Sequence, residues 1–166
     1  SRTEKNAGTY ATTASGTDGN YNLSFVDGSM RINKAALTAT GNSTSVTYNG
    51  ANQTVSGFTV SGLQGSDTVA SLSSVAASGA TGKNAGSYTN TVTAGTETNY
   101  TVSTVNGGLT IAKANATVTA NSGTLTYNGG NQTVSGFTAS GLVGGDTAAV
   151  LSGVTASRTE KNAGTY

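Results

Sequence analysis

The side chains that could carry out acid–base or metal chemistry are few in this chain, and they are scattered. The absence of Cys and His removes thiol nucleophiles, disulfides, imidazole bases and the commonest metal ligands. Hydrolysis by paired carboxylates needs two of them about 5–10 Å apart across a cleft, and calcium would need a clustered set such as D-x-D-x-D-G. Neither spacing is present among the seven acidic residues, which are Glu4, Asp18, Asp27, Asp67, Glu97, Asp146 and Glu160.

The acidic residues are better explained as turn-capping groups. Asp18 and Asp27 each precede a Gly, where a side-chain oxygen can accept hydrogen bonds from turn amides. Asp67 and Asp146 each precede a Thr at the start of an expected strand. We therefore expect no enzymatic activity, no catalytic or cofactor-binding residue, no metal and no cofactor.

Three other patterns could carry chemistry or binding. Lys-Asn-Ala-Gly, which begins at Lys5, Lys83 and Lys161, could suggest a Lys–Asn isopeptide crosslink. That reaction needs a buried Lys facing an Asn and an acid, whereas adjacent Lys and Asn before a Gly are typical of a turn. N-glycosylation stays open at the N-x-[ST] triplets, although most of them are expected by chance in a chain rich in Asn, Ser and Thr; they begin at Asn22, Asn42, Asn52, Asn99, Asn115 and Asn131.

Tyrosines occupy regular places in the sequence, among them Tyr48, Tyr88, Tyr100 and Tyr127. They could form a surface on which sugars stack. Regular placement more often means that the rings anchor a core and leave the hydroxyl at its rim. We favour core anchors.

The most informative feature is internal repetition. Residues 157–166 (SRTEKNAGTY) repeat residues 1–10 letter for letter, at an offset of 156. TYNG-x-NQTVSGFT occurs at Thr47–Thr59 and again at Thr126–Thr138, an offset of 79, and Lys-Asn-Ala-Gly recurs at offsets of 78. Fixed periods of this length are the signature of an array of similar modules.

The composition favours β-structure throughout. The chain is rich in Thr, which favours strands, and in Gly and Asn, which supply tight turns. No amphipathic helical period is present. With charged residues at 9% and a net charge of +1, no basic footprint for nucleic acid or an anionic membrane exists, and no apolar run is long enough to span a membrane.

We predict an all-β fold of tandem small β-sandwich (Ig-like) modules, with β-grasp-like modules as the alternative. Strands are expected near residues 36–40, 44–48, 53–60, 67–73, 86–94, 99–105 and 108–112. The expected inward-facing residues are Tyr48, Val55, Phe58, Leu63, Leu72, Val75, Tyr88, Val92, Tyr100, Val102, Leu109 and Ile111.

The repeats predict three segments. Residues 1–35, the N-terminal segment, form the C-terminal half of a repeat; residues 36–114, the central segment, form a complete repeat; residues 115–166, the C-terminal segment, form the N-terminal half of another. No Pro and no Gly/Ser-rich linker separates them, which predicts stiff joints. Because the two half-repeats are complementary, the front half of one molecule could pair with the back half of another by strand exchange.

Several of the repeated motifs resemble those of a known family. They are Tyr48-Asn-Gly, Ser61-Gly-Leu with Gly65-x-Asp-Thr, Lys83-Asn-Ala-Gly-x-Tyr, Asn99-Tyr and Leu109-Thr-Ile-x-Lys-Ala. In this order they resemble the YDG/MBG-type repeats of large bacterial surface adhesins, which include filamentous-haemagglutinin-like proteins. Here Tyr-Asn-Gly replaces the family's Tyr-Asp-Gly, which keeps the turn chemistry and removes a charge. The resemblance implies an exported, β-rich spacer or adhesive module without enzymatic activity.

Two functions follow as expectations. The first is a structural role as stalk or spacer in a secreted or cell-surface bacterial fibre, whose partners are neighbouring repeats or identical chains and which contributes to adhesion and biofilm. The absence of Cys fits such an exported protein. The second is a module that binds a host glycan or matrix protein weakly and gains avidity by repetition.

Overall fold

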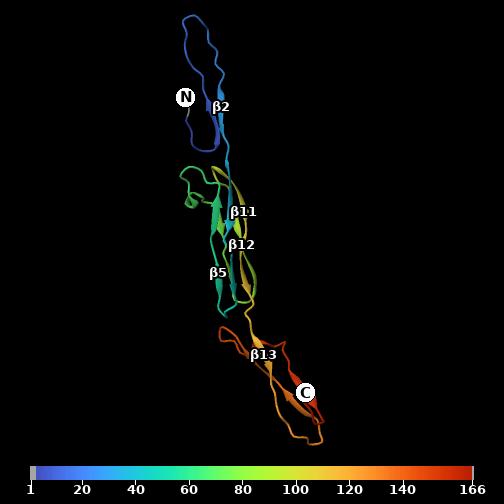
Figure 1. The fold of residues 1–166 in the computed structure, drawn as a ribbon. Coiled ribbons are helices and arrows are strands. Elements are labelled where there is room, and N and C mark those ends of the chain that lie inside the picture. Colours follow the sequence, from blue (N-terminus) through green and yellow to red (C-terminus); the bar gives the residue numbers. More distant parts are fainter. Residues whose placement is uncertain (1–2, 166) are drawn as a thin grey trace. The chain divides into compact units, whose positions relative to one another are not determined.

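The computed structural model of the chain describes residues 3–165; Ser1, Arg2 and Tyr166, which belong to the duplicated SRTEKNAGTY segments, lie outside the described residues. The described residues form short strands and two short 3-10 helices, η1 and η2 (Figure 1). The predicted all-β class is therefore confirmed. No helix among these residues is long and apolar enough to cross a membrane. The elements are β1 (Gly8–Thr12), β2 (Gly28–Ile32), β3 (Ala35–Gly41), β4 (Thr44–Thr47), β5 (Gln53–Val55), β6 (Phe58–Ser61), η1 (Val69–Ser71), β7 (Val75–Ala77), β8 (Ala80–Gly82), β9 (Gly86–Asn90), β10 (Val92–Ala94), β11 (Tyr100–Val105), β12 (Gly107–Ala112), β13 (Thr117–Ala120), β14 (Gln132–Ser135), β15 (Phe137–Ser140), η2 (Ala148–Val150) and β16 (Ser157–Glu160).

The chain divides into two compact units. The first, unit 1, comprises residues 3–44, 54–80 and 88–109. The second, unit 2, comprises residues 45–53, 81–87 and 110–165. The strand orders are β1-β2, β10-β7, β11-β3-β6, β4-β12-β9, β13-β15, β14-β16 and β5-β8.

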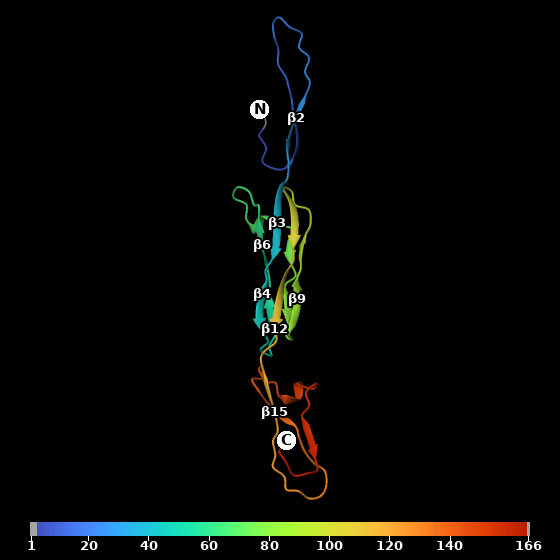
Figure 2. The same ribbon diagram turned by 45° about the vertical axis from the view of Figure 1, so that its right-hand side comes forward.

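Unit 1 is organised around strand β3, which lies between β11 and β6 (Figure 2). The β3–β11 pair is parallel and runs from Ala35 opposite Tyr100 to Thr40 opposite Val105. The β3–β6 pair is antiparallel, with Thr38 opposite Ser61. A parallel pair needs a long crossover connection, and here the connection spans most of the central segment.

The core of unit 1 packs on the β3–β11 pair. Alternate residues of β3 point inward, so that Leu37 and Ala39 are buried. They pack with Leu72, Val92 and Tyr100, and half-buried residues close the cluster: Ala35, Phe58, Val60, Leu63, Val75, Ala77 and Val102. A core this thin is expected for a module of about 80 residues.

Unit 2 repeats part of this arrangement. Strands β13 and β15 are antiparallel, with Thr117 opposite Ser140. These residues lie 79 positions after Thr38 and Ser61, which are opposite each other in unit 1. Strands β14 and β16 pair with Gln132 opposite Glu160. Residues at the same places in the repeat therefore pair in the same register in both units.

Several predicted strands match and others do not. The strands expected at 36–40, 44–48, 99–105 and 108–112 are β3, β4, β11 and β12. The strand expected at 53–60 is divided into β5 and β6, because Gly57 takes a positive φ of 79° between them. The one expected at 86–94 is likewise divided into β9 and β10.

The strand predicted at 67–73 is wrong. This segment contains the 3-10 helix η1, where the Thr68 N–H donates to Ser71 Oγ (3.1 Å) and the Ser71 N–H to Thr68 O (2.9 Å). Such local bonds of Ser and Thr compete with strand pairing. Strands β7 and β8 were not predicted, because their Ala- and Gly-rich sequences have little β-propensity.

The predicted inward-facing set agrees with the structure, because all twelve of its members are buried or half-buried. The prediction omitted Leu37, Ala39 and Ala80, which are buried. It also omitted two buried polar residues, Asn90 and Glu97.

Candidate functional site: contacts between successive segments

Several polar side chains form hydrogen bonds where one segment meets the next. We call the first joint the contacts of Asn6, Ala7 and Lys34 with Glu97 and Asn99, all of which lie in unit 1. The Asn99 side chain accepts the Ala7 N–H through Oδ1 (2.9 Å) and donates from Nδ2 to Asn6 Oδ1 (3.2 Å). Lys34 Nζ donates to Glu97 O (2.6 Å). The Lys-Asn-Ala-Gly turn of the N-terminal segment is thereby held against the central segment.

Glu97 is the buried carboxylate of the first joint, with 6% of its surface exposed. Its Oε1 accepts the Ser74 N–H (2.7 Å) and the Ser74 hydroxyl (2.6 Å). These two donors, with a smaller contribution from the nearby charge of Lys34, lower the pKa of Glu97 below its usual value. Glu97 therefore stays ionised and fixes the loop that bears Asn99.

The second joint consists of Tyr48–Gly50 against Gly144–Asp146, all within unit 2. The Tyr48 hydroxyl donates to Asp146 Oδ2 (2.9 Å). The hydrogen bond to Asp146 raises the pKa of Tyr48, because it stabilises the protonated hydroxyl, and desolvation and the negative charge of the carboxylate act in the same direction. A turn of the central segment is thereby hydrogen-bonded to the C-terminal segment.

The backbones also approach closely at the second joint. A Cβ placed on Gly50 would lie 2.5 Å from the Cα of Gly144, and one on Gly144 would meet Gly50 in return. Both glycines have positive φ values, 78° and 65°. Their counterparts one period away, Gly129 and Gly65, would meet no atom within 4 Å. The close approach therefore belongs to the joint and not to the turns themselves.

A related contact lies inside the central segment. The Tyr100 hydroxyl donates to Asp67 Oδ2 (2.6 Å) and accepts the Gln64 N–H (3.0 Å). The Asp67 carboxylate raises the pKa of Tyr100, and the Gln64 N–H opposes this in part. Asp67 and Asp146 are 79 residues apart and thus occupy the same place in the repeat, yet they accept hydroxyls from tyrosines at different places.

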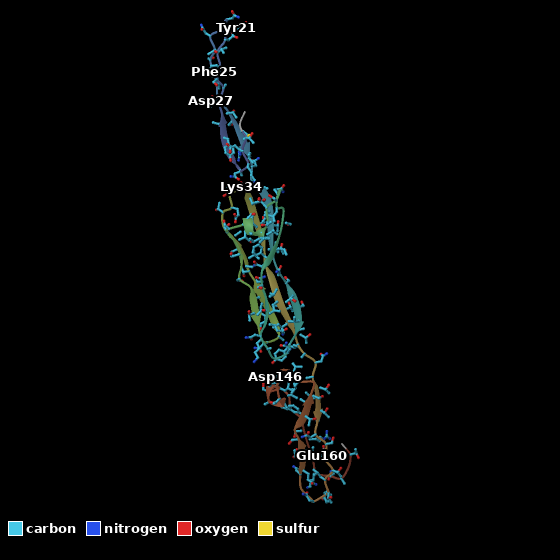
Figure 3. The ribbon with its side chains drawn as sticks, turned by 90° about the vertical axis from the view of Figure 1, so that its left-hand side faces the viewer. Tyr21, Phe25, Asp27, Lys34, Asp146 and Glu160 are labelled. Atoms are coloured by element: carbon cyan, nitrogen blue, oxygen red, sulfur yellow. The ribbon has the colours of Figure 1, made fainter. Side chains whose placement is uncertain are left out.

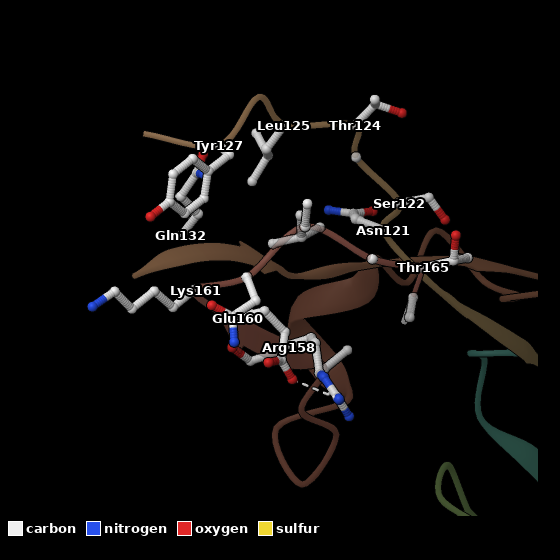
Figure 4. Close-up of a pocket in the computed structure, with 18 of the residues that line it drawn as sticks. Asn121, Ser122, Thr124, Leu125, Tyr127, Gln132, Arg158, Glu160, Lys161 and Thr165 are labelled. Carbon is white, nitrogen blue, oxygen red and sulfur yellow. Dashed lines mark ion pairs between the residues drawn. The ribbon is translucent and has the colours of Figure 1, made fainter. Parts of the chain in front are cut away.

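Unit 2 contains an open hollow of about 880 Å³ (Figure 4). Leu125, Tyr127 and Gln132 line one side, and Arg158 and Glu160, whose side chains form an ion pair of 2.6 Å, line the other. Tyr127 is 60% exposed, whereas its counterpart Tyr48 is half-buried.

The central segment shows what occupies the corresponding space in a complete repeat. Asn121 and Gly136 line the hollow and correspond to Asn42 and Gly57. The carbonyl oxygens of Asn42 and Gly57 accept hydrogen bonds from Nδ2 of the fully buried Asn90 (3.2 and 2.9 Å). In the central segment, Asn90 of β9 therefore occupies space that corresponds to part of the hollow.

The acidic residues take several roles. Asp18 Oδ1 accepts the Asn20 N–H (2.8 Å), which is a turn contact as expected, whereas Asp27 Oδ1 accepts the N–H of Ala14 (3.3 Å), 13 residues earlier in the chain. Asp67 and Asp146 instead accept tyrosine hydroxyls, and Glu97 accepts Ser74. No group of three acidic side chains that could hold a metal ion occurs among residues 3–165.

The structure also shows where the other candidate residues lie, namely the lysines, the triplet asparagines and the tyrosines. Lys5, Lys83 and Lys161 are exposed, whereas an isopeptide crosslink would need burial. Of the triplet asparagines, Asn42 donates to Ser56 O (2.8 Å) and Asn99 forms the first joint, while the other four, Asn22, Asn52, Asn115 and Asn131, are exposed. Tyr88 is half-buried and Tyr100 is buried.

Sequence reasoning did not find the joints. Asp67 and Asp146 occupy matched places in the repeats, but periodicity does not tell which tyrosine reaches which aspartate. Similarly, Asn99 was considered only as a glycosylation triplet and as part of a family motif, and not as a contact between segments.

A family model described as MBG domain (YGX type) matches residues 37–110. Comparisons with curated proteins and with solved structures gave no match. The matched residues run from β3 into β12 and include Tyr48, Asp67 and Asn99.

Proposed function

Because a family model of YGX-type MBG domains matches residues 37–110, we propose that this chain is a stalk or spacer within a long bacterial adhesin fibre at the cell surface or outside the cell. The match supports the broader assignment as an adhesin-type repeat module. The stalk role rests on one observation: each segment is hydrogen-bonded to the next through side chains of the repeated sequence. A dedicated ligand site would more often interrupt such repetition.

The short connections between segments support this role. Strand β2 ends at Ile32 and β3 begins at Ala35, while β12 ends at Ala112 and β13 begins at Thr117. Linkers this short, without Gly/Ser-rich sequence, leave a module little freedom to swing. The joints would restrict it further, giving the fibre reach and stiffness.

The partners in this proposal are neighbouring repeats of the same chain or identical chains. They would join end to end through β contacts, including strand exchange between complementary half-repeats. Support comes from apolar side chains that the half-repeats expose at places that are covered in the central segment. Val118 is 40% exposed, for example, whereas its counterpart Ala39 is fully buried.

The stalk role can be tested by ¹⁵N relaxation of the full chain in dilute solution. We expect residues 37–110 and 117–160 to share one rotational correlation time. Asp146→Ala, which removes the acceptor of Tyr48, should give residues 117–160 a shorter one. Ser66→Ala, an exposed neighbour of Asp67, is the control and should change nothing. Independent tumbling of the segments in the unmodified chain would contradict the proposal.

A second candidate function is recognition of a host glycan or matrix protein. The observation that favours it is the hollow of Figure 4, where an exposed Tyr127 lies near Gln132. An aromatic ring beside amide groups suits sugar stacking. Saturable binding on a glycan array that Tyr127→Ala abolishes would favour this function, whereas absence of binding would leave the stalk role.

A further inference from the structure

We propose that the Asn49–Gly50 turn is a latent site of spontaneous deamidation, which the second joint protects while it is closed and releases for reaction when it opens. The proposal goes beyond the stalk function and rests only on the geometry of the turn and of the joint. Asn49 is converted to a mixture of aspartate and isoaspartate, so that an opening of the joint leaves a covalent change behind.

The reaction joins two groups that are adjacent in every Asn-Gly sequence. The backbone nitrogen of the glycine forms a bond to Cγ of the asparagine, and the bond from Cγ to Nδ2 breaks. Nδ2 leaves as ammonia, together with the proton that the backbone nitrogen gives up. Water then opens the resulting succinimide ring at either carbonyl carbon, which gives aspartate or isoaspartate. Nothing is oxidised or reduced, and water is the only other reactant.

The chain contains three Asn-Gly sequences, which begin at Asn49, Asn106 and Asn128. Glycine suits the reaction because it has no side chain to shield the attacking nitrogen or to restrict its rotation. Asn49 and Asn128 occupy the same place in the repeat, and the glycines that follow them, Gly50 and Gly129, have φ values of 78° and 79°. The chain therefore contains the same turn twice.

Both copies of this turn activate the asparagine side chain in the same way. Asn49 Oδ1 accepts the Ala51 N–H (3.0 Å), and Asn128 Oδ1 accepts the Gly130 N–H (3.0 Å). A donor at this distance stabilises the negative charge that develops on Oδ1 when Cγ is attacked. The two turns are thus equally prepared for the first step, and Asn49 is exposed, so that water can reach the succinimide.

The neighbouring backbone distinguishes the two turns. A Cβ placed on Gly144 would lie 2.7 Å from Asn49 O and 3.0 Å from Gly50 N, which is the attacking atom. Because Gly144 lies against this peptide group, the peptide plane cannot rotate to bring Gly50 N onto Cγ, and attack requires that approach. No atom lies within 4 Å of a Cβ placed on Gly129. The same rotation therefore meets no such obstacle at Asn128.

A hydrogen bond of the second joint keeps Gly144 in this position. The Tyr48 hydroxyl donates to Asp146 Oδ2 (2.9 Å), and Asp146, which is labelled in Figure 3, lies two residues after Gly144. When this bond breaks, Gly144 is released from Gly50. Asn49 is then as free to react as Asn128.

Asn106 is protected by contacts that do not involve the second joint. Its Oδ1 accepts the Val92 N–H (2.9 Å), and Gly107 is the first residue of β12. A Cβ placed on Gly107 would collide with Asn42 O. All of these contacts lie inside the central segment, so Asn106 should stay unreactive whether the joint is open or closed.

The reaction products do not fit the closed joint. Both carry a carboxylate in place of the amide, next in sequence to Tyr48, whose partner Asp146 is also a carboxylate. Isoaspartate adds a methylene group to the main chain at the peptide group that Gly144 contacts, where the backbones already approach closely. The modification therefore keeps open a joint that has opened once.

Tryptic peptide mapping of the full chain after incubation in mildly alkaline buffer tests the proposal. Cleavage places the three asparagines in different peptides, which are residues 35–83, 84–113 and 114–158. Each rate is divided by the rate of the same asparagine in urea, which removes the effect of flanking sequence. We expect Asn128 to react at least about tenfold faster than Asn49, the factor for a hydrogen bond to a charged group that must break first. Equal rates would overturn the proposal.

Two variants assign the protection to the joint. Asp146→Ala should raise the rate at Asn49 by about tenfold, toward that of Asn128, and leave Asn106 unreactive. Asp67→Ala is the matched control, because it removes the carboxylate at the same place in the repeat and leaves the joint intact; the rate at Asn49 should not change. An equal rise in both variants would mean that general loss of stability exposes Asn49. That result, or no rise in Asp146→Ala, would refute control by the joint.

The lasting effect of the modification has its own test. In an Asn128→Gln chain, the form modified at residue 49 is separated by anion exchange through its added negative charge. Amide hydrogen exchange at residues 144–146 should be faster in this form, because the joint no longer closes. Unchanged exchange would refute the lasting effect. These rates do not report on the stalk function, which is tested by ¹⁵N relaxation.

Discussion

At the scale of single residues, the chain uses one residue type for two tasks. Asp67 fixes Tyr100 within the central segment, and Asp146 fixes Tyr48 across the second joint. The two aspartates occupy the same place in the repeat, so the difference lies in which tyrosine is within reach. Hydrogen bonds to charged groups are stronger than those between neutral groups, which suits contacts that must hold segments together.

The two tyrosines predict an alkaline limit of stability. The pKa values of Tyr48 and Tyr100 are raised above 10.0 by their aspartate partners. Groups of this kind stabilise the folded state fully below pH 10.0, and this stabilisation is lost as the pH rises through the higher folded pKa. Absorbance titration of phenolate should show a component above pH 10.0 that shrinks in Tyr48→Phe and again in the double variant with Tyr100→Phe. An unchanged titration in the double variant would contradict the assignment.

Glu97 predicts a loss of folding stability at acid pH, whereas the two tyrosines predict a loss at alkaline pH. Its pKa is lowered from 4.5 by the Ser74 donors, so its contribution to stability is present above pH 4.5 and lost as the pH falls through the folded pKa. Urea unfolding at several pH values should show a loss of stability on acidification that is smaller in Glu97→Gln. Ser74→Ala keeps the N–H donor and should have an intermediate effect. If the unmodified chain and both variants lost the same stability on acidification, Glu97 would be excluded as the source of that loss.

At the scale of elements, Asn90 joins the ends of several strands. Its side chain accepts the Gly79 N–H (2.9 Å) and donates to Asn42 O and Gly57 O, and it is fully buried. Asn90→Ala leaves all three backbone groups without this partner, and we expect a loss of about 3 kcal/mol or more in the free energy of unfolding. Asn52→Ala, at an exposed site, should stay within about 0.5 kcal/mol. Similar losses for both variants in chemical denaturation would refute this role.

The turns at the second joint offer a matched pair. Gly50 and Gly129 have nearly equal φ values, 78° and 79°, but only Gly50 meets a neighbouring backbone. Gly129→Ala should cost about 1–2 kcal/mol of backbone strain, and Gly50→Ala should cost at least about 1 kcal/mol more because the added methyl collides with Gly144. Thermal denaturation measures both. Equal losses would show that the close approach contributes nothing.

The elements also show what could and could not be predicted. Alternation in β3 and β12 and the Asn-Gly turns identified four strands, and the inward-facing rings and aliphatic residues were found. The segment 67–73 failed because local Thr68–Ser71 hydrogen bonds outweigh strand propensity. The parallel partnership of β3 with β11 could not be found, because it joins residues about 65 apart in the chain without any local signal. The same limit hid the joints.

At the scale of the whole molecule, the buried core lies in one segment. Every buried apolar side chain among residues 3–165 falls between Leu37 and Ile111. Regions with few buried contacts open most easily. In dilute solution, hydrogen exchange followed by mass spectrometry should therefore be slowest in β3 and β11 and fastest at residues 13–27. Uniform protection at low concentration would contradict this distribution of stability.

The parallel pairing of β3 with β11 has a consequence for the chain under tension. Chain enters the pair at Ala35 and leaves it at Val105, at opposite ends of two strands that run in the same direction. A pull on the two ends therefore slides the strands past each other. In this shear geometry the hydrogen bonds between the two strands carry the force at the same time and do not break one after another. We therefore expect the pair to resist extension until all of these hydrogen bonds break together.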